Sequence, residues 1–79
     1  MYGAVSGAPA RFRAVAGYQV EVYLRDGRRI DSPTLNRSDA NQEFAALGEV
    51  VGAPGKVERP WIVVDRGDSI SAVALYEEP

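Results

Sequence analysis

Hydrophobic and polar residues alternate most clearly over residues 18–25, where every second position is apolar. This period of two predicts a strand with one buried face and one solvent-exposed face. Asp26-Gly27 follows directly, and this pair favours a tight hairpin turn because glycine adopts positive φ without steric cost. The pattern therefore predicts a β-hairpin whose return strand covers residues 28–32.

The hydrophobic period changes after residue 36 to one typical of a helix. Four apolar residues at spacings of four, three and four form a single stripe: Ala40, Phe44, Leu47 and Val51. We expect the helix to begin at Ser38, whose hydroxyl can accept a backbone N–H, and to end at Gly52. Glu43 falls on the outward face, and Gly48 would allow close approach to a sheet.

Two further strands are predicted in the last third of the chain. Residues 53–60 are expected to form a loop, and the apolar run 61–64 is typical of a strand in a sheet interior. Residues 69–76 form the last predicted strand. Their irregular apolar spacing predicts a bulge or a short 3₁₀ turn near Ser71.

These elements predict an α+β fold in ββαββ order, with one four-stranded antiparallel sheet and a single α-helix packed on one face. Residues 1–10 are rich in Gly, Ala, Ser and Pro without periodicity, so we expect a flexible N-terminal lead-in followed by one domain over 11–79. The predicted core consists of Val20, Val22, Leu24, Ile30, Phe44, Leu47, Val51, Ile62, Val64, Val73 and Leu75.

Composition restricts the chemistry that this chain can perform. The 79 residues include no histidine and no cysteine. Disulfides and Cys/His zinc sites are therefore excluded, and acid–base catalysis would rest on carboxylates alone. Asp65 and Asp68 lie in a short polar turn that lacks the ligand ladder of a calcium loop. We expect a non-enzymatic protein with no catalytic residues, no cofactor and no metal.

The charge is unevenly distributed along the chain. Residues 1–37 carry six arginines against three acids, whereas residues 38–79 carry three basic and eight acidic residues, which gives a net charge of −2. Several arginines flank the first predicted turn, beside a tyrosine on the exposed face of the strand. These residues are the candidate partner-binding site: Tyr23, Arg25, Arg28, Arg29 and Arg37.

Two functional hypotheses follow from these features. A small core without disulfides, an open sheet face and opposed charge in the two halves favour a protein-interaction module. Its partner is expected to be a second copy, in a homodimer or homo-oligomer, or another protein. The alternative is weak nucleic-acid binding through the arginine-rich hairpin, with arginines on phosphates and Tyr23 stacking on a base. The acidic total and a pI near 5.0 argue against it. With no secretory or membrane-spanning pattern visible, we expect a cytoplasmic protein.

Overall fold

The computed structural model describes residues 15–79, so the predicted lead-in over residues 1–10 lies outside the described part. Within these residues the fold is α+β, with one α-helix and antiparallel strands. In chain order the elements are β1 (Gly17–Leu24), β2 (Arg29–Asp31), α2 (Arg37–Val50), β3 (Val57–Arg59), β4 (Ile62–Val64), the 3₁₀ turn η1 (Gly67–Ser69) and β5 (Ile70–Glu78).

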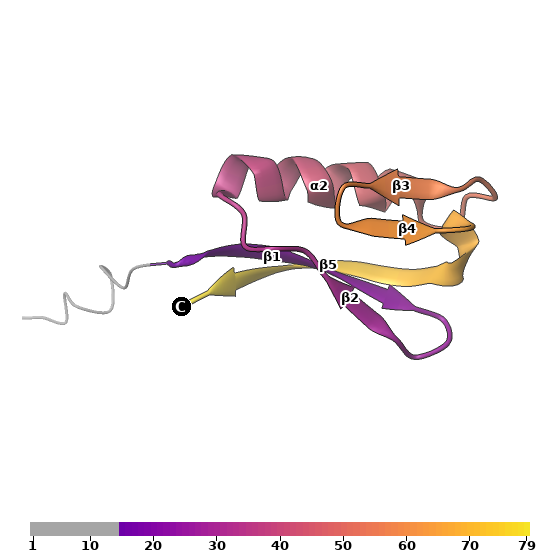
Figure 1. Cartoon of the computed structure of the whole chain (residues 1–79), viewed down its shortest axis with the longest axis horizontal. Helices are drawn as coiled ribbons and strands as arrows, with labels where there is room; N and C mark the ends of the chain where they lie inside the picture. The colour runs from indigo at the N-terminus through magenta and orange to yellow at the C-terminus, as the bar shows by residue number, and fades with distance from the viewer. Residues whose placement is uncertain (1–14) are drawn as a thin grey trace, which may run out of the picture.

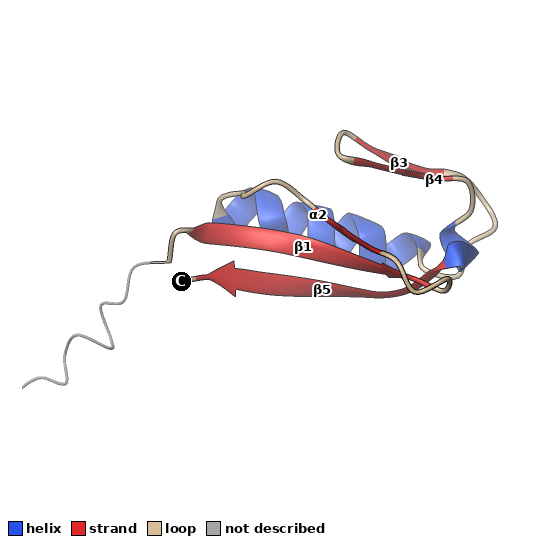
Figure 2. Ribbon diagram, turned by 60° about the horizontal axis from the view of Figure 1, so that its bottom comes forward, coloured by secondary structure: helices blue, strands red, loops and turns tan. Residues whose placement is uncertain are grey.

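The main sheet has three strands in the order β2-β1-β5, and all neighbours are antiparallel. β1 is the central strand and pairs with β5 from Gly17 opposite Glu78 to Leu24 opposite Ile70. The helix lies along one face of this sheet (Figures 1 and 2). The prediction of a single four-stranded sheet is therefore wrong, because the remaining two strands form a separate hairpin.

The separate hairpin pairs β3 with β4 and lies on the helix side of the main sheet (Figure 2). β3 falls within residues 53–60, which the sequence pattern assigned to a loop. Ile62 and Val64 are buried, but Val63 between them is 57% exposed. The prediction that this run lies in the sheet interior is therefore wrong: among the described strands β4 pairs with β3 alone, and one of its faces is open to solvent at Val63.

The helix begins at Arg37 and is capped by Asn36, not by the predicted Ser38. The Asn36 side-chain oxygen accepts a hydrogen bond from the backbone N–H of Asp39 at 2.8 Å, which satisfies one of the unpaired donors of the first turn. The predicted end of the helix is confirmed. The helix ends at Val50, and Gly52 just beyond it has a φ of +83°, the left-handed conformation typical of a helix end.

The helix buries a different stripe from the predicted one. Ala40 and Leu47 are buried as expected, but Phe44 is 38% and Val51 36% exposed. Glu43, predicted to face outward, is instead part-buried against the separate hairpin. Because the helix contacts that hairpin as well as the sheet, its buried stripe is rotated toward Glu43 and away from Phe44.

Most of the remaining core assignments hold. Leu75 is the exception in the sheet, at 38% exposed, because β5 is an edge strand. The register shift between Tyr23 and Leu24 leaves Ser71 unpaired, which confirms the predicted bulge. Ile30 and Val73 are partly buried against the following buried cluster: Val20, Val22, Leu24, Ala40, Leu47, Val57, Ile62, Val64 and Ile70.

A buried hydroxyl completes the hydrogen bonding between β1 and β2. Ser32 is 2% exposed, and its Oγ accepts a hydrogen bond from the Val20 N–H at 2.9 Å. The same hydroxyl donates to the carbonyl oxygen of Pro33 at 2.9 Å. The hydroxyl therefore replaces a backbone carbonyl where the ladder ends, and it satisfies an otherwise unpaired buried N–H.

The separate hairpin is held to the helix by one polar cluster. The Glu43 carboxylate accepts hydrogen bonds from the guanidinium of Arg59 and, at 2.8 Å, from the indole Nε1 of Trp61. Both donors lower the pKa of Glu43 below its ordinary value of 4.5, with Arg59 the larger cause. This cluster supplies a specific polar link between the helix and the separate hairpin.

A close backbone contact joins the end of the helix to the start of β5. The Gly52 N–H donates to the Gly67 carbonyl at 3.0 Å, and the Gly67 N–H donates to the Gly55 carbonyl at 2.9 Å. A Cβ at Gly67 would overlap the carbonyl oxygen of Val50, whereas a Cβ at Gly55 would meet open space. Glycine at position 67 thus permits the approach that brings β5 under the helix.

Replacing Gly67 by Ala is expected to lower the free energy of unfolding by about 1–3 kcal/mol, since the helix end must move away from β5. The matched control is Gly55→Ala, which we expect to change that free energy by no more than about 0.5 kcal/mol. Urea denaturation followed by circular dichroism measures both. Equal stability of the two variants would show that position 67 tolerates a side chain.

Acidification is expected to weaken the link between helix and hairpin. Because the pKa of Glu43 is lower in the folded than in the unfolded chain, its contribution is present above about pH 4.5 and is lost as the pH falls through the lowered folded pKa. Thermal melts of the wild type and Glu43→Gln should therefore differ at neutral pH and converge on acidification. A difference that stays constant across this range would contradict the role of the Glu43 charge.

Candidate functional site

The five residues predicted to bind a partner do not form one surface. Tyr23 and Arg29 pair across β1 and β2 on the sheet face opposite the helix. Arg25 and Arg28 lie at the two ends of the hairpin turn, and Arg37 is the exposed first residue of the helix. The arginines therefore divide among the open sheet face, the turn and the helix start.

On the open sheet face, Tyr23 and Arg29 are engaged by acidic neighbours. The Tyr23 hydroxyl donates to Glu21 Oε1 at 2.7 Å, which is the main reason why the pKa of Tyr23 is raised above its ordinary value of 10.0. Arg29 Nε lies 3.0 Å from Asp31 Oδ1, and a second nitrogen lies 4.0 Å from Glu21. This face is thus a network of hydrogen bonds and ion pairs within the sheet.

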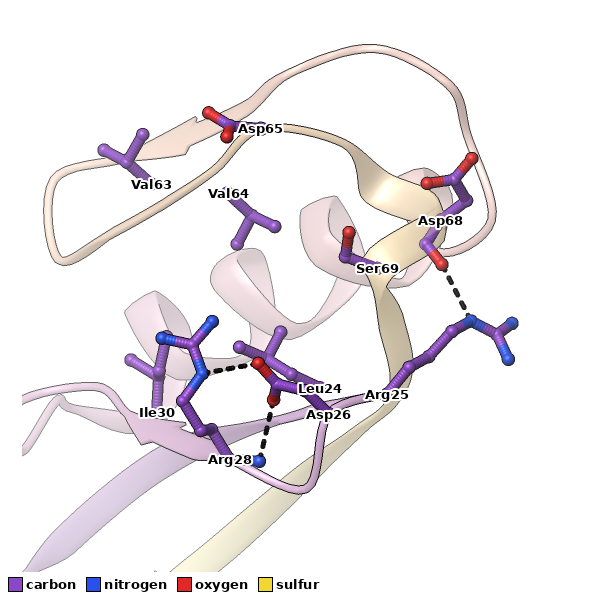
Figure 3. A pocket seen from close by; sticks show the side chains of 10 residues that line it. All are labelled: Leu24, Arg25, Asp26, Arg28, Ile30, Val63, Val64, Asp65, Asp68 and Ser69. Carbon is purple, nitrogen blue, oxygen red and sulfur yellow. Dashed lines mark hydrogen bonds and ion pairs between the residues drawn. The ribbon is translucent and has the colours of Figure 1, made fainter.

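The two arginines at the turn are also engaged within the chain. Arg28 Nε lies 2.8 Å from Asp26 Oδ2, and Arg25 Nε donates to the carbonyl oxygen of Asp68 at 2.7 Å. Figure 3 shows these two side chains diverging on either side of Asp26. Their guanidinium groups therefore do not converge on a common anion.

A hollow of about 400 Å³ lies between this turn and the segment from β4 to η1 (Figure 3). The pKa values of Asp26 and Asp68 are lowered, by hydrogen bonds from the Arg28 backbone N–H and the Arg66 guanidinium respectively. These carboxylates are stabilised as paired anions, and general acid catalysis requires the opposite shift. The hollow is lined by Leu24, Arg25, Asp26, Arg28, Ile30, Val63, Val64, Asp65, Asp68 and Ser69.

β5 is the longest edge strand among the described residues, and its outer edge has no partner strand there. This strand has nine residues, and β1 is its one partner among the described strands. The unpaired edge of a strand of this length presents a row of free N–H and C=O groups, to which another strand can pair. By comparison, the opposite edge strand β2 has three residues.

The backbone groups that face this free edge can be assigned from the hydrogen bonds of β1. Leu24 N–H bonds to the Arg28 carbonyl and Val20 C=O accepts from Ser32 N–H, so the even-numbered residues of β1 point toward β2. Sides alternate along a strand, so the odd-numbered residues of β1 point toward β5, where their partners are even-numbered. The outward backbone groups of β5 therefore belong to Val73, Leu75 and Glu77.

Exposed apolar side chains accompany the free edge. Leu75 lies opposite buried Val20 and so shares the helix face of the sheet. Phe44 lies about 100° around the helix from Glu43, on the flank away from the separate hairpin, and Val51 is seven residues further along the same flank. We call the outer edge of β5, with Phe44, Val51 and Leu75, the β5 edge surface.

Sequence reasoning missed the β5 edge surface because the strand order could not be read from local patterns. The run 61–64 carried no local signal against an interior strand, since Pro60 precedes it and lies in the turn between β3 and β4. Placing that run outside the sheet would have left the last strand at an edge. The exposure of Phe44 and Val51 carried no signal, since their helical spacing matches that of core residues.

Comparison with other proteins supplies no further identification. No protein-family model matches the chain, and no significant match was found among curated proteins or solved structures. Within residues 15–79, no helix is long and apolar enough to cross a membrane. In the same residues, no three acidic side chains are placed to share a metal ion.

Proposed function

We propose that this chain is a small non-enzymatic protein-interaction module that associates with a second copy of itself. The observation that carries the proposal is the β5 edge surface, which combines the free outer edge of a nine-residue strand with three exposed apolar side chains. Pairing such an edge satisfies backbone groups and removes apolar area from water in a single contact.

The paired carboxylates support the non-enzymatic part of this proposal. Asp26, Asp68 and Glu43 all accept hydrogen bonds from arginine or backbone donors, and each has a lowered pKa. A carboxyl group that works as a general acid needs a raised pKa, which burial without a donor would supply. These acidic groups therefore suit structural roles.

The charge arrangement makes nucleic-acid binding the less favoured function. Phosphate contacts by Arg28 and Arg29 would have to compete with Asp26 and Asp31, which already lie within hydrogen-bond distance. Electrostatic binding to nucleic acid depends on free cations that release counterions from the phosphates. The ion-paired arginines offer less of that driving force than a basic surface would.

Sedimentation velocity over a micromolar concentration series is expected to show a reversible monomer–dimer equilibrium. Leu75→Lys should weaken it by about tenfold or more, since a charge would be placed on the apolar edge (about 1.4 kcal/mol for tenfold). Val63→Lys is the matched control, because Val63 is 57% exposed on β4, and it should leave the equilibrium unchanged. A wild-type chain that stays monomeric throughout the series would overturn the proposal.

A further inference from the structure

We propose that the two copies join through their β5 strands, antiparallel and centred on Ala74, to form one continuous six-stranded sheet. This inference rests on the proposed self-association and specifies its geometry. The outward backbone groups of Val73 and Leu75 then bond to those of Leu75 and Val73 of the second copy. Ala74 lies opposite its own counterpart, on the two-fold axis.

The antiparallel direction follows from the charges along β5. The strand ends in Glu77 and Glu78 and contains no basic residue. A parallel arrangement would place these glutamates side by side, and like charges in direct opposition destabilise a sheet. In the antiparallel arrangement the glutamates of the two copies are separated, and they reach the start of the other β5, where Arg25 and Arg66 lie beside Asp68.

The register follows from the length of the strand and the sizes of its side chains. Ala74 is the midpoint of Ile70–Glu78, so centring there pairs the regular segment 72–76 of one copy with the same segment of the other, and the bulge at Ser71 lies beyond it. On the open face, Tyr76, which is 46% exposed, would lie opposite Ala72, and on the helix face Leu75 would lie opposite Val73. Large residues thus meet small or partly buried ones in both layers.

The position of the helix is compatible with a two-fold axis at Ala74. The helix runs from beside the Tyr18–Leu35 bridge to the contact with Gly67, so its middle, near Phe44, lies over the middle of the β1–β5 ladder. It packs over both β1 and β5. With strands about 4.8 Å apart, two such helices would be about 10 Å apart, the usual packing distance, with their Phe44 side chains adjacent.

Cysteine cross-linking tests this geometry, because the natural chain contains no cysteine. Ala74→Cys should form an intermolecular disulfide in a glutathione redox buffer, since residues facing each other in a non-hydrogen-bonded antiparallel pair have Cα atoms about 4.5 Å apart. Ala72→Cys is the matched control on the same strand face. Its two Cα atoms would be about 14 Å apart, well beyond disulfide reach.

We expect the Ala74→Cys dimer to form at least about tenfold more readily than the Ala72→Cys dimer, as measured on non-reducing gels. Thermal melts of both reduced variants verify that they fold. If the chain dimerises by sedimentation but the two variants cross-link equally, the β5 geometry is wrong and the proposed self-association stands. If the wild type stays monomeric and neither variant cross-links above the collision rate, both proposals fall.

Discussion

The pairing of β1 with β5 is the constraint on which the rest of this structure depends. It joins the two ends of the described chain, from Gly17 opposite Glu78 to Leu24 opposite Ile70, and makes β1 the central strand. The helix can then bury Ala40 and Leu47 against a surface made of both strands. The same pairing fixes β5 at the border of the sheet, so the longest of the strands within residues 15–79 has one edge without a partner there.

Local features of the fold could be predicted because they depend on residues close in sequence. The alternation over residues 18–25, the Asp26-Gly27 turn and the bulge at Ser71 each follow from backbone preferences of short segments. Strand order depends on contacts between distant segments. The run 61–64 is apolar enough for a sheet interior, but it pairs with β3, only a few residues away, and leaves Val63 exposed.

The candidate site was predictable only in part, for the same reason. Residues two apart on a strand share a face, so the pairs Glu21 with Tyr23 and Arg29 with Asp31 were implicit in the sequence. The edge position of β5 was not implicit, because it depends on the order of the strands. Phe44 shows most directly what a local pattern cannot predict. Its exposure results from the rotation of the helix toward the separate hairpin, which Glu43 contacts.

Amide hydrogen exchange in β5, followed by NMR at several protein concentrations, tests the central claim most directly. Ala72, Ala74 and Tyr76 bond to β1 and should be protected at every concentration, whereas Val73 and Leu75 should exchange fast in dilute solution. As dimers form, protection should rise at Val73 and Leu75. Dimer formation with no change in exchange at these two amides would contradict the account.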